Sequence, residues 1–308
     1  MTAIATLTMN PALDIATATP EVRPTEKLRC GAPRYDPGGG GINVARVIHA
    51  LGSEARAVFP AGGPAGAMLG QLLVAQGVEY AAVPIAGQTR ESLTVHEETS
   101  GKEFRFVLPG PELSAHEQDA VFETLAALDP KPAWLVASGS LPPGIGEGFA
   151  KRLAETARGL GARLVLDAPG KVLRAEAGLG VYLVKPNLGE LEDMAGVKLD
   201  DHDKACAAAR NLIAEGVAEV VVLSLGSKGA QLVTDTICEH FEAIRVESVS
   251  AVGAGDAMLA GLVLALSRGD SLPDAMRFAM ATGAAATLRP GTQLVVREDV
   301  ERLLPGLG

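Results

Sequence analysis

Short apolar runs rich in β-branched residues recur along the chain, and stretches with helical spacing separate them. The runs cover residues 3–7, 56–59, 134–137, 163–166, 181–184 and 219–223. Runs of this kind are typical of buried strands in parallel sheets. Between them, apolar residues recur three or four positions apart, as at Ile42, Ala45 and Ile48. We therefore predict one α/β domain over residues 1–308, with a mainly parallel central sheet flanked by helices.

Two excursions interrupt this alternation, at about residues 12–36 and 89–108. Polar and apolar side chains mix over residues 28–35, 92–98 and 103–108, as they do in half-exposed antiparallel strands. We predict that the two excursions form one small β-sheet, which serves either as a lid or only as an exposed edge. A further hairpin over residues 230–234 and 238–243 is expected to widen the main sheet at one edge.

The composition excludes several classes of protein. Lys and Arg number 27 against 37 Asp and Glu, and the resulting net charge of −10 disfavours nucleic acids and acidic membrane surfaces as partners. The longest apolar stretch, residues 257–266, is too short to span a bilayer, so no membrane insertion is expected. Cys30, Cys206 and Cys238 are scattered and odd in number, which predicts neither a disulfide framework nor a metal knuckle. We expect reduced thiols and a cytoplasmic location.

The segment Gly253-Ala254-Gly255-Asp256 opens a strongly apolar helical stretch. Glycines at the start of a helix let backbone N–H groups converge on an anion. A bound phosphate would repel the Asp256 carboxylate, unless that carboxylate takes a proton from a hydroxyl attacking the phosphate. The alternative is an ordinary first-turn acid favoured by the helix dipole.

Four consecutive glycines, from Gly38 to Gly41, precede Asn43 and another helix. They let a ligand lie against the backbone, and Asn43 can hydrogen-bond a hydroxyl, so a polyol suits this surface. A flexible linker is the alternative. The segment does not fit the dinucleotide-binding pattern, because Asn43 stands where its third glycine is required.

Two further segments follow expected strands, where open α/β sheets bind ligands. Asn187 and Glu190 are three residues apart and can share one side of a helical turn. Their oxygen atoms suit Mg²⁺ held through water, although a capping Asn with a first-turn Glu explains the pattern equally well. The small residues 223–229 offer N–H groups to phosphate or ribose, or else form a plain turn.

Four basic residues lie in or beside the two excursions: Lys27, Arg29, Arg90 and Arg105. Each by itself is typical of a solvated strand edge. Together they could hold a phosphate monoester.

Five segments carry most of these features: PGGGGINVA, SGSLPPG, LVKPNLGEL, LSLGSKGA and VGAGDAM. They resemble segments of the ribokinase-like (PfkB) sugar kinases, in the same order and over essentially the whole chain. Within this family, TLTMNPALD, KLRC and FRFVLPG are most similar to the minor-isozyme type of bacterial 6-phosphofructokinase. One departure is Ala251, where related sequences often carry Thr.

The resemblance implies a role for each candidate residue. Asp256 would be the base, with the amides of Gly253, Ala254 and Gly255 as an anion hole. The sugar hydroxyls would be held by Asp14, Gly38, Gly39, Asn43 and Ser138. The phosphate already on the sugar would be held by Lys27, Arg29, Arg90 and Arg105, some of them reaching across a homodimer formed through the lid. The path of ATP would be lined by Lys185, Asn187, Ser224, Gly226 and Gly229.

The resemblance also implies two ion sites. Glu190 with Asn187 would organise Mg²⁺. A monovalent cation, K⁺, would be held by carbonyl groups near Ser250, Val252, Ala286, Gly291 and Gln293.

The activity expected from the resemblance is ATP-dependent phosphorylation of fructose 6-phosphate at its 1-hydroxyl. Fructose 1-phosphate and tagatose 6-phosphate remain alternative substrates, since each offers a phosphate and a reacting hydroxyl. A non-catalytic sugar-phosphate sensor on the same fold is another alternative, as is a dinucleotide-dependent oxidoreductase. The intact Asp256 and Glu190 argue against the sensor.

Overall fold

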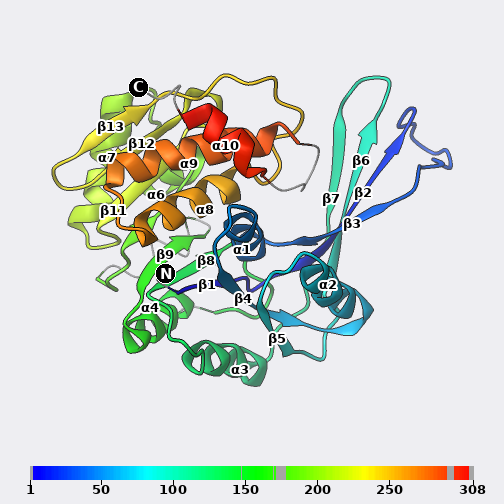
Figure 1. Cartoon of the computed structure of the whole chain (residues 1–308), viewed down its shortest axis with the longest axis horizontal. Coiled ribbons are helices and arrows are strands. Elements are labelled where there is room, and N and C mark those ends of the chain that lie inside the picture. Colours follow the sequence, from blue (N-terminus) through cyan, green and yellow to red (C-terminus); the bar gives the residue numbers. More distant parts are fainter. Residues whose placement is uncertain (1–2, 147, 169, 171–177, 290–294, 305–308) are drawn as a thin grey trace.

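The computed structural model describes residues 3–146, 148–168, 170, 178–289 and 295–304. Within these residues, nine strands form the main sheet (Figure 1). The seven parallel strands are, in spatial order, β11 (Val220–Ser224), β10 (Leu183–Val184), β9 (Arg163–Asp167), β8 (Trp134–Ser138), β1 (Ile4–Leu7), β4 (Ala55–Ala61) and β5 (Tyr80–Pro84). The antiparallel hairpin β12 (Ala230–Val233) and β13 (Cys238–Phe241) extends the β11 edge, as expected.

Helices cover both faces of this sheet because side chains alternate along each strand. Val136 on β8 packs with the helices of one face, and its neighbour Leu135 packs with those of the other. The first face carries α1 (Gly40–Ala50), α2 (Gly63–Ala75), α8 (Ala254–Ser267), α9 (Leu272–Thr287) and α10 (Arg297–Leu303). The second carries α3 (Ala115–Ala126), α4 (Phe149–Leu160), α6 (Leu188–Ala195) and α7 (His202–Ala214). The predicted α/β layers are therefore confirmed.

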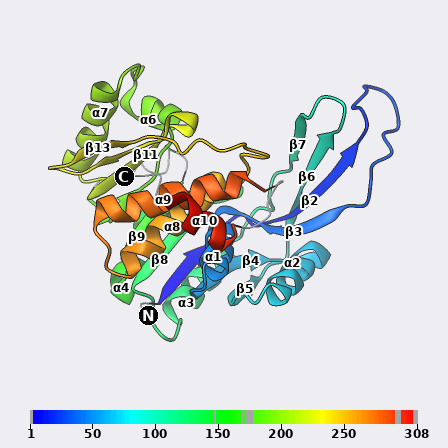
Figure 2. The ribbon, with the colours of Figure 1, turned by 45° about the horizontal axis from the view of Figure 1, so that its top comes forward.

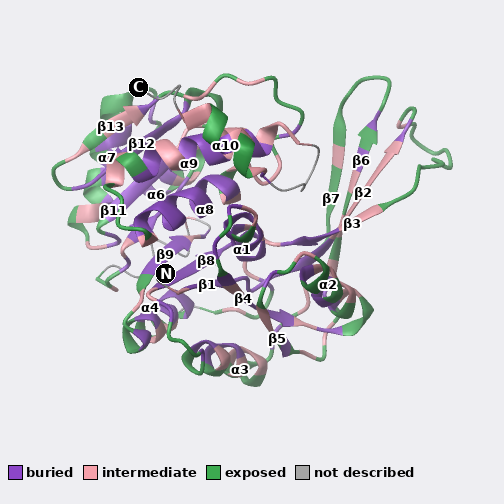
Figure 3. Cartoon of the chain, viewed as in Figure 1, coloured by how far each residue is buried: buried purple, intermediate pink, exposed green. Residues whose placement is uncertain are grey.

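A separate four-stranded sheet projects from the body, in the order β3 (Arg34–Gly38), β2 (Ala12–Thr19), β6 (Arg90–Glu97) and β7 (Glu103–Val107). Strands β2 and β6 are parallel, and the other two pairings are antiparallel. Figures 1 and 2 show its outer end extending away from the main sheet, and Figure 3 shows that much of this end is exposed. The two excursions thus form one small sheet, as predicted.

The strands of the first excursion differ from the prediction. Residues 28–33 are not in a strand, and β3 begins only at Arg34. Residues 12–19, for which no strand was predicted within the first excursion, form β2, an inner strand of the small sheet. Pro33 and Pro37 place the extended segment later than the pattern suggests, and Pro37 is tolerated because β3 lies at the sheet edge.

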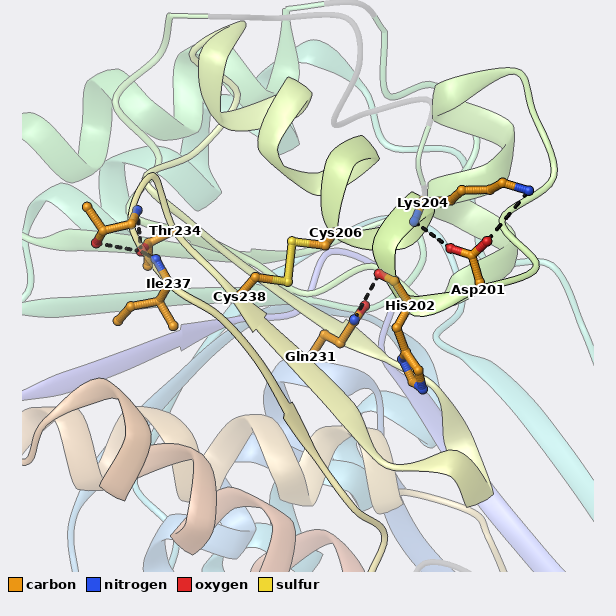
Figure 4. The surroundings of a disulfide bond; sticks show 9 residues. Asp201, His202, Lys204, Cys206, Gln231, Thr234, Ile237 and Cys238 are labelled. Carbon is orange, nitrogen blue, oxygen red and sulfur yellow. Dashed lines mark hydrogen bonds and ion pairs between the residues drawn. A yellow bond between two sulfur atoms is a disulfide. The ribbon is translucent and has the colours of Figure 1, made fainter.

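The expectation of reduced thiols is wrong for two of the three cysteines. A disulfide joins Cys206 on α7 to Cys238 on β13 (Figure 4), and Cys30 is free and exposed. The two bonded residues are 32 positions apart in the sequence, yet α7 lies across the edge hairpin. Beside the disulfide, the rings of His202 and His240 lie 4.2 Å apart. The disulfide between these remote segments could not be inferred from the number or spacing of the cysteines.

Among the helices of the described residues, none combines the length and the apolar character needed to cross a membrane.

Candidate active site

The candidate residues gather at the carboxyl edge of the main sheet. Parallel strands end at one common edge, so residues that are far apart in the sequence meet there. Ser138 ends β8, Asp167 ends β9 and Ser224 ends β11, while Lys185 directly follows β10.

Asp256 lies in the first turn of α8, after Gly253 at the N-cap. The φ angle of Gly253 is 76°, in the left-handed region that favours glycine. N–H groups in a first helical turn lack partners within the helix. The amides predicted to bind the transferred phosphoryl group, those of Gly253, Ala254 and Gly255, therefore lie beside the predicted base.

The Asp256 carboxylate is hydrogen-bonded to Asn43, whose Nδ2 donates to Oδ2 over 2.9 Å. Burial raises the pKa of Asp256 to about 6, the Asn43 hydrogen bond opposes this rise, and the charge of Asp167 adds to it. Lys185 also lowers the pKa of Asp256. The carboxylate is thus ionised at neutral pH yet basic enough to accept a proton, as a general base must be.

The glycine run lets α1 approach the sheet closely. A Cβ atom on Gly38 would collide with the Asp14 carboxylate, and one on Gly40 would collide with Ser138 Oγ. Between them, Gly39 has a φ angle of 118°. Asp14 therefore lies beside Gly38, and Ser138 lies beside Gly40 at the start of the helix that carries Asn43.

Asp14 faces basic groups of the small sheet. Burial raises the pKa of Asp14 to about 6, and the positive charges of Arg90, Arg105 and Arg46 counteract that rise. A hollow between the small sheet and the body is lined in part by Asp14, Arg105 and Val252. The small sheet therefore faces the loop that leads into α8.

The four predicted phosphate ligands fall into two groups. Arg90 is hydrogen-bonded to the carbonyl oxygens of Asn10, at 3.1 and 3.3 Å, and of Leu108, at 3.3 Å. Together with Arg105, it lies close enough to Asp14 to lower the pKa of that carboxyl. Lys27 and Arg29 are exposed in the connection beyond the outer end of β2. The structure of one chain does not bring this second pair to the hollow.

The residues predicted to bind the nucleotide lie at or beside the ends of β10 and β11. Lys185 Nζ lies 3.2 Å from Asp167 Oδ2, and a Cβ atom on Gly255 would lie 3.7 Å from the same Nζ. Asn187 forms a parallel β-bridge with Ser224. Gly226 opens a short 3₁₀ turn, Gly226–Lys228, and Gly229 follows it. Lys185, Asn187, Ser224, Gly226 and Gly229 therefore share the edge formed by β10 and β11.

Asn187 and Glu190 form a reciprocal cap at the start of α6. Asn187 Oδ1 accepts from the Glu190 amide at 2.9 Å, and Glu190 Oε2 accepts from the Asn187 amide at 2.8 Å. This is the capping arrangement kept open as an alternative. Among the described residues, no three His, Cys, Asp or Glu side chains are grouped to hold a metal. Mg²⁺ is often bound through only one or two protein carboxylates together with substrate phosphates and water, and Glu190 is one such carboxylate at this edge.

Part of the predicted monovalent-cation site comes together. The amides of Val249 and Ser250 both donate to the carbonyl of Thr287, next to Ala286 at the end of α9. Ser250 Oγ accepts from the amide of Val252. Gly291 and Gln293 lie outside the described residues.

Two residues of the site were missed in the sequence. Asp167 bonds Lys185 and accepts from Ser138 Oγ at 3.2 Å, and its position directly after the expected strand 163–166 was an available signal. Arg46 is buried on α1, with Nη1 donating to Asn43 Oδ1 at 3.2 Å. A single arginine in an apolar helical pattern offered no comparable signal.

The chain is similar along its whole length to known sugar-phosphate kinases. It is 50% identical over 299 residues to the "ATP-dependent 6-phosphofructokinase isozyme 2" of Mycobacterium tuberculosis, covering 97% of this chain and 88% of that protein. It is 42% identical over 304 residues to the Escherichia coli protein of the same name, covering 98% of both. A "1-phosphofructokinase" of Borreliella burgdorferi is 30% identical over 302 residues, covering 98% of this chain and 96% of that protein.

Solved structures agree with this similarity. Phosphofructokinase-2 from Escherichia coli in complex with fructose-6-phosphate superposes with a TM-score of 0.93 at 41% identity, covering 100% of this chain and 99% of that one. The same enzyme in complex with potassium gives a TM-score of 0.95 at 42% identity, with the same coverage. The family model described as "pfkB family carbohydrate kinase" matches residues 7–299. This chain therefore belongs to the pfkB family of carbohydrate kinases.

Proposed function

We propose that the protein is an ATP-dependent 6-phosphofructokinase, which transfers the γ-phosphoryl group of ATP to the 1-hydroxyl of fructose 6-phosphate. The observation that carries this proposal is that the buried Asp256 carboxylate, at the start of α8, accepts from Asn43 and lies within the electrostatic influence of Lys185. Asn43 is a proposed ligand of the sugar, and Lys185 is a proposed ligand of ATP. The similarity to enzymes of this name over nearly the whole chain supports the proposal.

In the proposed reaction, Asp256 accepts the proton of the 1-hydroxyl as the hydroxyl oxygen attacks the γ-phosphorus. The bond from that phosphorus to the β,γ-bridging oxygen breaks, and ADP leaves. Negative charge on the transferred group is met by the first-turn amides of α8, at the positive end of the helix dipole. Lys185, on the nucleotide side of Gly255, supplies a positive charge to the phosphates of ATP.

The phosphate on the sugar is proposed to bind Arg90 and Arg105 of the same chain. Guanidinium groups suit this role because they form charge-assisted, often bidentate, bonds to phosphate. Lys27 and Arg29 lie beyond the outer end of β2, so we assign them to the sugar phosphate of a partner subunit. The protein would then be a homodimer joined through the small sheet, which acts as a lid on each site.

Glu190, with Asn187, is proposed to hold the water shell of Mg²⁺. When bound, Mg²⁺ neutralises charge on the ATP phosphates. The backbone around Ser250, Val252 and Ala286 is proposed to hold K⁺, a role supported by the potassium complex of the similar Escherichia coli enzyme. We also propose a cytoplasmic location, because ATP and sugar phosphates are cytoplasmic metabolites.

Three alternatives compete with this proposal: two other sugar-phosphate substrates and a function without catalysis. Relatives named 1-phosphofructokinase share the family but are less similar, which places fructose 1-phosphate behind fructose 6-phosphate. Tagatose 6-phosphate presents the same groups and is separated only by assay. A silent sugar-phosphate sensor would bind these ligands without turnover.

The test is a coupled assay of ADP release with each sugar phosphate at saturating ATP. We expect the highest kcat/KM with fructose 6-phosphate. A higher value with fructose 1-phosphate or tagatose 6-phosphate would reassign the substrate. Tight sugar-phosphate binding without ADP release would favour the sensor.

A further inference from the structure

Arg46 is the largest fully buried side chain in the described part of the molecule, and the proposed reaction gives it no role. It lies on α1, one helical turn after Asn43, with an exposed fraction of 1%. A buried charge is costly unless it is paired and hydrogen-bonded. A guanidinium group in this position therefore needs a fixed set of partners, and those partners show what it does.

The partners of Arg46 hold its guanidinium rigidly. Nε donates to Gln76 Oε1 at 2.8 Å, just after α2, and Nη1 donates to the carbonyl of Pro37 at 2.9 Å. Nη2 lies 3.7 Å from Asp36 Oδ1 on β3. The same Nη1 also donates to Asn43 Oδ1 at 3.2 Å. The guanidinium is thus anchored by β3 and by the end of α2 while it contacts the side chain that bonds Asp256.

The contact with Arg46 decides which way the amide of Asn43 faces. An arginine carries only donors, so it requires the carbonyl oxygen of Asn43 on its side. The NH₂ group of Asn43 must then face Asp256, which it does at 2.9 Å. In the flipped orientation, two donors would meet at Arg46 and two acceptors would meet at Asp256. Both ends of the amide therefore exclude the flipped state.

We propose that Arg46 is a positioning residue, which holds the amide of Asn43 so that its NH₂ group always donates to the base Asp256. This inference rests on the proposed role of Asp256 as the base. The donated hydrogen bond favours the charged carboxylate and so opposes the rise in pKa that burial imposes on Asp256. Arg46 would keep the base ionised without touching the sugar or ATP.

Other charges near this chain of contacts also act on it. Asp256 faces Asp167 from β9 and Lys185 from the segment after β10. Arg46 faces Asp36, Asp14 and Arg34 from the small sheet. Burial lowers the pKa of Arg46 to about 10, the charges of Asp36 and Asp14 oppose this fall, and the charge of Arg34 adds to it. Arg46 therefore stays protonated across the acidic limb of the pH profile, which lies near pH 6. A change in the pH profile cannot come from titration of Arg46 itself.

The experiment is a double-mutant cycle read by the pH dependence of kcat between pH 5 and 9. Wild type, Arg46→Met, Asn43→Ala and the double variant are compared at saturating sugar and ATP. We expect Arg46→Met to move the acidic limb of the kcat profile to higher pH by about one unit. The reason is that the hydrogen bond from Asn43 to the charged Asp256 carboxylate is lost when Arg46 no longer holds the Asn43 amide. The KM for ATP should not change.

The decisive comparison is the double variant. If Arg46 acts through Asn43, adding Arg46→Met to Asn43→Ala should move the limb no further. An additive shift, or an Arg46→Met limb that coincides with wild type, would overturn the proposal. If Arg46→Met does not fold, Arg46→Lys carries the same cycle, because it keeps the buried charge but loses the fork that spans Pro37 and Asn43. Its limb should move upward by less.

Leu153→Ala on α4 is the control for general loss of stability, since Leu153 is fully buried in the opposite layer. It should lower the melting temperature and leave the acidic limb in place. The cycle is run on whichever sugar phosphate the wild type phosphorylates. Failure of the substrate assignment is thus seen in the wild type alone, and failure of the positioning role is seen only in the cycle.

Discussion

Asp14 and Asp256 are both proposed to act on the sugar, and burial raises the pKa of each carboxyl to about 6. Their neighbours differ. The rise at Asp14 is opposed by Arg90 and Arg105, which are charges suited to hold an anionic sugar. The rise at Asp256 is opposed first by the neutral donor Asn43. One carboxylate is therefore suited to anchor a hydroxyl among cations, and the other to accept a proton.

The first prediction concerns pH. An aspartate acts as a base only when it is ionised, so kcat should fall as the pH is lowered through about 6, the pKa that burial gives Asp256. Steady-state rates at saturating substrates between pH 5 and 8 measure this. The residual rate of Asp256→Asn should lack the same limb. A wild-type kcat that stays flat down to pH 5 would remove Asp256 as the base.

The second prediction concerns the sugar phosphate. Arg105→Ala should raise KM for fructose 6-phosphate by about 10- to 100-fold, because a charge-assisted hydrogen bond to phosphate is lost. KM for ATP should change little, as should any turnover of unphosphorylated fructose. Arg152→Ala on α4, which is also a surface arginine, serves as the matched control. Equal losses on both sugars would mean that Arg105 shapes the site without binding the phosphate.

At the scale of single elements, the small sheet has two unlike faces. Register and alternation place Asp14 and Ser92 on one face, and Ile15, Leu93 and Phe106 on the other. The second face is apolar, and the exposed fraction of Phe106 on it is 52%. An apolar face on a projecting sheet suits the proposed contact with a partner subunit.

The third prediction follows from this face. Phe106→Ser should shift the protein from dimer toward monomer, since it removes apolar area from the proposed interface. Sedimentation velocity measures the shift, and KM for fructose 6-phosphate should rise with it as Lys27 and Arg29 are lost from the partner's site. Val74→Ser, at another exposed apolar residue on α2, is the control and should leave the association unchanged. A Phe106→Ser protein that remains a dimer would place the interface elsewhere.

The fourth prediction separates the two roles of Glu190 at the start of α6. Glutamine also suits this position of a capping box, so Glu190→Gln should keep the helix while removing the charge. We expect the rate to require more free Mg²⁺, with a smaller change in ATP affinity. Titration of the rate with Mg²⁺ at fixed ATP checks this. An unaltered titration would leave Glu190 with its capping role alone.

At the scale of the whole molecule, the buried strands were predictable because runs such as residues 134–137 and 220–223 are apolar throughout, as is typical of strands covered on both faces. Residues 12–19 were not, because β2 mixes apolar residues with Asp14, Thr17 and Thr19, and it lies in a half-exposed sheet where its partner strands come from residues 34–38 and 90–97. Strand patterns depend on burial, and burial here depends on pairing between distant segments.

Some residues of the candidate site were likewise predictable from local sequence, and others were not. Asp256, Asn43 and Asn187 stand in local motifs, where glycines and helix starts mark them in the sequence. Asp167 and Arg46 could be assigned to the site only from the tertiary fold, because the parallel sheet brings Asp167 to Lys185 and packing buries Arg46, the single arginine of α1. The disulfide belongs with these, since Cys206 and Cys238 meet only where α7 crosses the edge hairpin. Contacts made by the tertiary fold leave little trace in the spacing of residues.

The central claim is that this chain phosphorylates fructose 6-phosphate with Asp256 as the base. It is tested most directly by quantifying ADP and fructose 1,6-bisphosphate in the same reaction, with wild type and Asp256→Asn side by side. We predict equal amounts of the two products from wild type, and a rate about 10²- to 10⁴-fold lower in Asp256→Asn with sugar and ATP binding retained. ADP formed without the bisphosphate, or near-normal turnover by Asp256→Asn, would contradict the claim.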